Sequence, residues 1–339
     1  LFMRKAVSVL FLSFTFSIAS SQVINREPLS ERITGYTIDA SLDPVTKTVT
    51  GNMNAYWVNS SGDIVPDIHM HLYMNAFRSE ETTFRKESDA LPFPGELYPG
   101  WIDVLSFSDR KGTNLLGRME YISPDDGNPY DKTVIRVSLP EPAKPGDTVF
   151  VSLQFETKLP NVTFRTGYND DFFFVAQWFP KFGVYEPAGM RYAIKGAWNC
   201  HQFHANSEFY SNHSVYEVTI SLPSEYVVGT CGMLISETVT GEGIKTSVYR
   251  AEDIVDFAWT AWPDFTVIKD KWKHVDITLL IPPERSSQAE RQFRAVKNAL
   301  EYFNNKVGPY PWPHLTIVDP PMKGAGAGGM EYTTMFTTS

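Results

Sequence analysis

Gly328, Gly329, Met330 and Glu331 combine a permissive backbone with a carboxylate, a pattern that could hold the charged end of a peptide. Glycine lacks a Cβ atom, so the main chain can approach a ligand closely. Residues 332–338 are Tyr, Thr, Met and Phe, which favour an extended strand. Such a strand can pair with an extended peptide while the carboxylate binds the peptide's positive amino terminus. The alternative interpretation is a solvated acid beside an ordinary glycine loop.

The run from Gly324 to Gly329 also matches the spacing G-x-G-x-x-G, which in dinucleotide-binding proteins opens a helix that holds pyrophosphate. The residues that follow are poor helix formers, and Asp319, Pro320 and Pro321 separate the glycines from the preceding strand. We therefore favour a peptide site over a dinucleotide site.

Metal and nucleophile chemistry have weaker support in the sequence. His201 and His204, beside Cys200 and Glu208, are metal-ligand types, but no clear helix aligns them, and structural or surface roles are favoured. His69 and His71 share one strand face, and we expect both to be half-exposed. Neither G-x-S-x-G nor H-E-x-x-H occurs in the 339 residues, so no catalytic set is complete and no metal ligand is assigned.

The composition predicts an ordinary globular protein. Hydrophobic residues make up 42% of the chain and charged residues 20%. The formal net charge of −9 argues against nucleic acid as a partner, because phosphate binding needs a basic surface.

The first residues indicate export. Met3-Arg4-Lys5 is a basic start, residues 6–19 are an apolar run, and small residues follow, so we predict a signal peptide over residues 1–21. An uncleaved anchor is the alternative, and no later segment is long and apolar enough to span a membrane. A periplasmic or secreted location follows, with membrane association left open. Cys200 and Cys231 could form a disulfide there or remain buried thiols.

Residues 24–269 alternate between apolar and polar in many short stretches separated by Pro- and Gly-rich turns, which predicts a β-sandwich or saddle. Strands are expected over residues 33–42, 45–50, 68–73, 133–139, 148–155 and 215–222.

The pattern changes near residue 270. A strand over residues 274–281 precedes a helix with a capping box from Ser287 to Glu290, and residues 315–318 form another strand. The apolar stripe of this helix is expected at Ala289, Phe293, Val296, Leu300, Phe303 and Val307, and Gly308-Pro309 should end it. Residues 270–339 therefore predict a β-α-β segment, the start of a second domain.

Gly328-Gly329-Met330-Glu331 resembles the G-x-M-E-N signature of the aminopeptidase N family of zinc metallopeptidases, the gluzincins. The residues from Tyr332 to Thr338 resemble an exported bacterial branch of that family. Residues 177–186, 208–223 and 256–260 resemble further segments of the same family, in the same order.

This resemblance implies a β-saddle domain followed by the first part of a thermolysin-like catalytic domain. It implies peptide substrates with a free amino terminus, whose ammonium group Glu331 would bind and whose main chain Gly328, Gly329 and Met330 would pair with. It also implies zinc, with ligands expected roughly two dozen residues beyond Glu331, downstream of Ser339. We therefore expect a fragment, inactive as it stands.

Two departures from the family pattern weaken the aminopeptidase assignment. Tyr332 stands where the family has Asn, and no second acceptor for the amine is secure among Asp170, Asp171 and Gln177. A non-catalytic peptide- or protein-binding β-domain is the competing interpretation.

Overall fold

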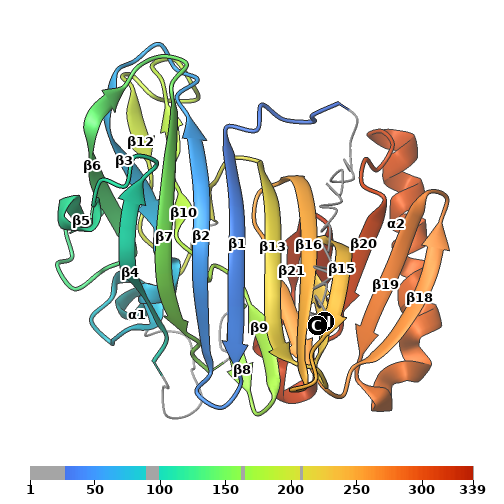
Figure 1. The fold of residues 1–339 in the computed structure, drawn as a ribbon. Helices are drawn as coiled ribbons and strands as arrows, with labels where there is room; N and C mark the ends of the chain where they lie inside the picture. Colours follow the sequence, from blue (N-terminus) through green and yellow to red (C-terminus); the bar gives the residue numbers. More distant parts are fainter. Residues whose placement is uncertain (1–26, 89–98, 162–164, 207–208, 339) are drawn as a thin grey trace, which may run out of the picture.

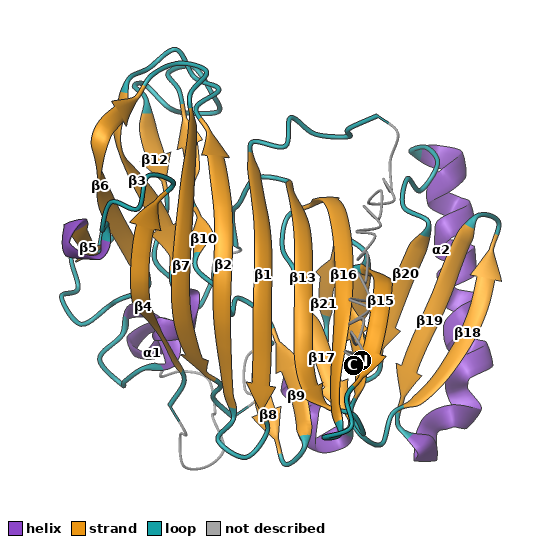
Figure 2. Cartoon of the chain, viewed as in Figure 1, coloured by secondary structure: helices purple, strands orange, loops and turns teal. Residues whose placement is uncertain are grey.

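The computed structural model describes residues 27–88, 99–161, 165–206 and 209–338, so the predicted signal peptide lies outside it. Strands dominate the described chain, with one long sheet, smaller sheets packed against it and a further sheet that carries the long helix (Figures 1 and 2). The predicted mainly β fold class is confirmed.

The largest sheet has seven strands. One neighbouring pair, β1 with β13, is parallel, and the other neighbours are antiparallel. In spatial order the strands are β15 (Met233–Val239), β16 (Ile244–Ile254), β13 (Ser214–Pro223), β1 (Thr34–Asp43), β2 (Thr48–Val58), β7 (Thr148–Lys158) and β4 (Trp101–Asp109). All six strands predicted before residue 270 overlap strands of this sheet or of a neighbouring four-stranded sheet, with shifted ends.

Two glycines in the middle of this sheet are covered by aromatic rings from the neighbouring strand. Gly35 lies directly opposite Tyr56, and Gly51 lies opposite Phe155. A Cβ atom on either glycine would come within 2.3 Å of the facing ring. The ring therefore takes the space that a side chain would fill, and compensates for the weak packing of glycine in a strand.

Smaller sheets cover the inner face of the long sheet. They comprise β10 (Lys181–Phe182), β3 (Val65–His71), β6 (Val134–Ala143) and β5 (Met119–Ile122); β14 (Val227–Thr230), β17 (Trp259–Trp262), β9 (Phe172–Val175) and β8 (Gly167–Asn169); and β11 (Val184–Glu186) with β12 (Ala197–Asn199). The short helices are η1 (Tyr73–Phe77), α1 (Thr83–Glu87) and η3 (Leu116–Arg118).

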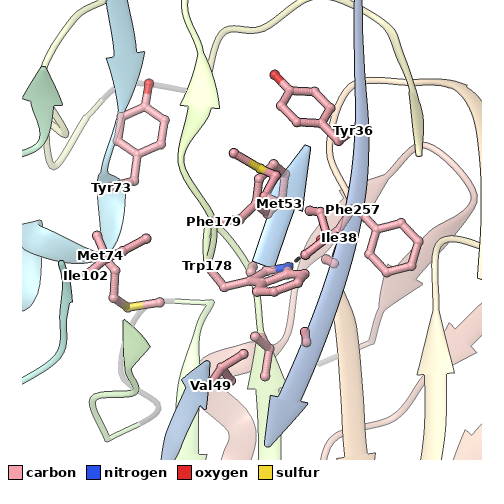
Figure 3. Close-up of a cluster of buried hydrophobic side chains, with 14 of the residues drawn as sticks. Tyr36, Ile38, Val49, Met53, Tyr73, Met74, Ile102, Trp178, Phe179 and Phe257 are labelled. Carbon is pink, nitrogen blue, oxygen red and sulfur yellow. Dashed lines mark hydrogen bonds between the residues drawn. The ribbon is translucent and has the colours of Figure 1, made fainter. Parts of the chain in front are cut away.

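An aromatic core joins these sheets (Figure 3). Trp178 is fully buried at its centre and its indole N–H donates to the carbonyl of Phe257 at 2.9 Å. The ring of Phe179 packs edge-on to Tyr36, 5.4 Å away. Each large ring contributes about 1.5–3 kcal/mol by leaving water, so this cluster holds the amino-terminal sheets together.

The sheet of the carboxy-terminal part has five strands and packs against the one long helix of the described chain. In spatial order they are β18 (Thr266–Trp272), β19 (Val275–Ile281), β20 (His314–Val318), β22 (Met335–Thr337) and β21 (Met330–Tyr332). β19 and β20 are parallel and α2 (Ala289–Lys306) connects them, as predicted for a β-α-β unit. The sheet already includes β18, which begins at Thr266, a few residues before the predicted boundary at 270.

The predicted start of α2 is wrong. No side chain caps the helix, because η4 (Pro283–Gln288) runs directly into it and the Ser286 carbonyl accepts from the Ala289 N–H. The backbone therefore satisfies the donor that the capping box would have satisfied.

The apolar stripe of α2 is only partly buried. Its first four predicted members, up to Leu300, pack against the sheet. Phe303 is 57% exposed and Val307 82% exposed, contrary to the prediction, because the last turn extends past the sheet. The helix ends at Lys306, just before the predicted stop at Gly308, which has a positive φ of 146°. Within the part of the chain that the structure describes, no helix could cross a membrane.

Candidate functional site

The segment with Glu331 forms a hairpin at the edge of the five-stranded sheet. The strand predicted over residues 332–338 is instead divided, with β21 and β22 antiparallel and a turn at Thr333 and Thr334 between them. Three residues pair on each side of the turn, from Met330 with Thr337 to Tyr332 with Met335. Within the described chain β21 pairs only with β22, so its other edge is open.

Glu331 is exposed on this open strand. Among the described residues its carboxylate has no hydrogen bond or ion pair. It lies opposite Phe336, so both side chains are on the sheet face that α2 covers. An exposed carboxylate without an internal partner keeps its full capacity to bind a cation.

A cavity of about 410 Å³ lies on the same face, between α2 and β22, and Phe336 is part of its wall. Two of its charged groups are engaged with each other, since Arg285 donates to Asp319 at 2.5 Å, and Gln292 donates to the same carboxylate at 3.0 Å. Arg291 also lines the cavity and has no ion pair among the described residues. The cavity thus offers apolar surface from Phe336 and Met322 next to the strand that carries Glu331.

The glycine segment is shaped by packing and by internal hydrogen bonds. A Cβ atom on Gly324 would lie 2.5 Å from the ring of Phe172, and Gly329 has a positive φ of 71°. The N–H groups of Gly328, Gly329 and Met330 donate to the Ala325 carbonyl, the Thr337 carbonyl and the Thr337 hydroxyl at 2.9, 3.2 and 3.0 Å. A peptide along this segment would therefore have to donate to its carbonyl oxygens.

The dinucleotide alternative does not fit this geometry. The glycines lie in a short 3-10 helix, η5 (Met322–Ala327), which leads into β21 rather than into an α-helix. η5 is too short to present the row of free N–H groups that holds pyrophosphate, and the segment after it is a strand.

Tyr332, at the position where the family pattern has Asn, faces the opposite side of the strand from Glu331. It is buried, and its ring lies 5.8 Å from that of Phe174. Burial raises the pKa of this phenol well above its usual value, and its hydroxyl has no hydrogen-bond partner among the described residues. The tyrosine anchors the hairpin by packing.

The turn of the hairpin is tied to the amino-terminal sheets by hydrogen bonds. The Thr334 hydroxyl donates to the carbonyl of Cys231, and the Val255 N–H donates to the Thr333 hydroxyl at 3.5 Å. The position of Glu331 thus depends on both parts of the chain.

The three candidates for a second amine acceptor all have other partners. Asp170 forms an ion pair with Lys323 at 3.1 Å, and Asp171 lies 3.9 Å from Lys47. Gln177 is buried with a positive φ of 54°. Its amide oxygen accepts a hydrogen bond from Lys181, and its amide nitrogen donates one to Asp256. Gln177 is therefore not free to bind a ligand ammonium, whereas the two aspartates are exposed and each lies beside a lysine.

Lys181, Asp256 and Gln177 form a buried polar cluster that sequence reasoning missed. Lys181 is 2% exposed and its ammonium lies 3.4 Å from the Asp256 carboxylate and 2.9 Å from the Gln177 amide oxygen. Burial lowers the pKa of Lys181, while the nearby carboxylate opposes this shift. The sequence did not reveal the cluster, because Asp256 is distant along the chain from Gln177 and Lys181 and only the fold brings them together.

The described histidines and cysteines do not form a metal site, and Glu208 lies outside the described residues. No group of three or more His, Cys, Asp or Glu residues in the described chain could hold a metal ion, so the zinc implied by the resemblance does not fit these residues. His204 is engaged by Glu87 at 2.8 Å and by Asp125 at 3.0 Å.

His71 is buried, contrary to the expectation, and lies 3.5 Å from the sulfur of Cys200. It is buried because β10 covers this end of β3, and burial lowers its pKa. Cys200 and Cys231 are both free and buried.

Comparison with known proteins supports the fold that the resemblance implied. No protein-family model and no curated protein matches the sequence. Among solved structures, an M1 zinc metallopeptidase from Deinococcus radiodurans is similar, with a TM-score of 0.54 and 13% identity. A mutant of that enzyme has the same TM-score and 12% identity.

The fold is similar to that of M1 zinc metallopeptidases. The likeness covers 86% of this chain and 58% of the neighbour's chain, so this chain spans little more than half the length of those enzymes. At this identity the comparison shows the fold alone. It agrees with the resemblance to the aminopeptidase N family and leaves the role of Glu331 to be tested.

Proposed function

We propose that the chain is the substrate-holding, amino-terminal part of an exported zinc metallopeptidase that removes residues from the amino end of peptides. The observation that carries this proposal is the exposed Glu331 carboxylate on the open edge of β21, in a fold similar to that of M1 metallopeptidases.

Glu331 binds the α-ammonium of a substrate in this proposal. An extended peptide lies along β21 and donates to carbonyl oxygens of Gly328, Gly329 and Met330, because their amides are occupied internally. Apolar side chains of the substrate would contact the surface near Phe336. Zinc is the cofactor that the family supplies, and its ligands are not assigned to any residue described here.

The test uses Glu331→Ala in a form of the protein that includes the zinc-binding sequence expected downstream of Ser339. Losing one partner of a desolvated charge pair costs about 2–4 kcal/mol. We therefore expect kcat/KM for peptides with a free amino terminus to fall by roughly 30- to 1,000-fold.

The matched control is the same peptide series with an acetylated amino terminus, for which Glu331→Ala should change little. Zinc content should stay constant in both proteins. An equal loss on free and acetylated peptides would show that Glu331 is structural, and the proposal would be withdrawn. If no zinc-binding sequence follows in the gene, the enzyme assignment fails and a peptide-binding β-domain replaces it.

A further inference from the structure

The edge strand β15 lies beside a groove that is separate from the Glu331 site. Six of its seven residues are exposed, including Leu234 at 52% and Val239 at 59%. It pairs only with β16 in the described chain, so one side of its backbone is open. An open edge of this kind is a template for another extended segment.

The groove has a volume of about 660 Å³, within the usual range for ligand pockets. One wall comes from Leu234 and Glu237 of β15, and the open edge of β14 contributes to the groove around Gly229. The other wall is the five-stranded sheet, through Lys269 of β18 and Thr278 of β19.

Lys269 and Thr278 lie on the face of the five-stranded sheet opposite to the face that carries Glu331. Thr278 and Leu280 line the groove, whereas Ile277 and Leu279 alternate with them and pack toward α2. Glu331 shares the α2 face, so the groove and the Glu331 site are on opposite sides of one sheet.

The polar groups of the groove have capacity that the chain does not use. The Nε2 atom of His314 lies 3.0 Å from the Cys231 carbonyl, which only accepts, so Nε2 carries the proton and Nδ1 is an acceptor. That Nδ1 atom is buried beneath the groove surface and has no partner among the described residues. Lys269, also in the lining, makes no ion pair within them.

The outward-facing groups of β15 follow from its register. The Thr240 N–H donates to the Ile244 carbonyl at 2.8 Å, and Thr238 lies opposite Thr246. Bonded pairs recur at every second residue, so Thr238 bonds to β16 while the N–H and C=O of Val239 point to the open edge. A register shift near Leu234 bends the strand's first half, which leaves the regular half from Ser236 to Val239 for pairing.

We propose that this groove binds a single extended segment of a partner polypeptide, which pairs with the open edge of β15 and places alternate apolar side chains between the two sheets. A lone strand suits the site because the groove is recessed between two sheets. The proposal does not depend on the proposed peptidase function.

The test measures fluorescence anisotropy of a labelled peptide as long as β15, seven residues, in which valine alternates with threonine and one glutamate can reach Lys269. We expect saturable binding to the chain. Val239→Pro removes an outward N–H without removing a bond to β16, and should weaken binding about tenfold. Val239→Thr keeps that N–H and should bind like the parent.

Two further controls distinguish backbone strand pairing from nonspecific apolar binding. The same peptide with N-methyl groups on alternate amides keeps its side chains and should not bind. Thr278→Phe fills the groove and should weaken binding, whereas Thr37→Phe, on the exposed outer face of β1, should not. If Val239→Pro fails to fold, as judged by circular dichroism, the N-methyl peptide and Thr278→Phe still decide the outcome.

Absence of binding, or binding that tolerates both Val239→Pro and the N-methyl groups, would overturn the proposal. Sedimentation velocity tests the other occupant. A dimer that Val239→Pro dissociates would assign the open edge to a second copy of the chain and would also overturn it.

Discussion

Asp256 and Glu331 both carry carboxylates near the contact between the amino-terminal sheets and the five-stranded sheet, yet their surroundings differ completely. Asp256 is 4% exposed and is held by Lys181, Gln177 and the Phe257 N–H. Glu331 is exposed and has no hydrogen bond or ion pair within the described chain.

This difference separates polar groups that hold the fold from polar groups that remain available. A buried charge is tolerated only when it is paired and hydrogen-bonded, so removing its partner is costly. An exposed, unengaged carboxylate contributes little to stability and can be used for binding. The following predictions test that contrast, from the largest expected effect to the smallest.

Lys181→Met should destabilise the protein strongly, because it leaves Asp256 buried without its cation. Breaking one side of a buried pair costs about 3–5 kcal/mol, and this should be measurable by urea unfolding. The double variant with Asp256→Leu removes both charges and should recover part of the loss. A single variant within about 1 kcal/mol of the parent would show that the cluster is not a structural centre.

Acid should weaken the protein through Asp253. Burial alone would raise the pKa of this carboxyl, but hydrogen bonds from Arg32 and Ser30 hold it at about 2, below its ordinary 3.8. A lowered pKa gives stability that is complete above about pH 4 and is lost as the pH falls toward 2.

The parent should therefore lose about 2 kcal/mol more than Asp253→Asn between pH 4 and pH 2. Chemical unfolding at several pH values measures this difference. Parallel pH profiles for the two proteins would show that the Arg32 contact adds no stability.

His204 should give a smaller effect of opposite sign. Burial alone would lower its pKa, but hydrogen bonds with Glu87 and Asp125 raise it. A raised pKa gives stability that is complete below about pH 6.5 and is lost as the pH rises through the folded value. His204→Gln should cost about 1 kcal/mol near pH 5.5 and little near pH 9, given the partial exposure of this pair. A cost that does not change with pH would assign the effect to packing.

Elements of the fold could be predicted where neighbouring residues alone determine them. Alternation identified β1, β7 and β13, and the spacing of apolar residues identified α2. The turn that divides the segment after Glu331 was missed, because β-prone threonines give no sign of where a hairpin reverses. The start of α2 was missed because a 3-10 turn took the place of a side-chain cap.

The candidate site was predictable only where neighbouring residues carry it. Gly329 and Glu331 are adjacent enough to form a motif, whereas Lys181 and Asp256 are brought together by tertiary packing. The fixed position of Gly324 against Phe172 likewise depends on two distant segments. Interactions of this kind leave no spacing that a single sequence could reveal.

The last prediction concerns Glu331 within this chain and is the complement of the Lys181 experiment. Glu331→Gln should change the free energy of unfolding by less than about 0.5 kcal/mol, because an exposed group without partners has no interaction to lose. Urea unfolding of the parent and both variants under identical conditions gives the comparison directly. If Glu331→Gln lowered the free energy of unfolding as much as Lys181→Met, Glu331 would be part of the structural framework. The distinction between carboxylates that stabilise the fold and carboxylates that remain available for binding would then fail at Glu331, on which the proposed function depends.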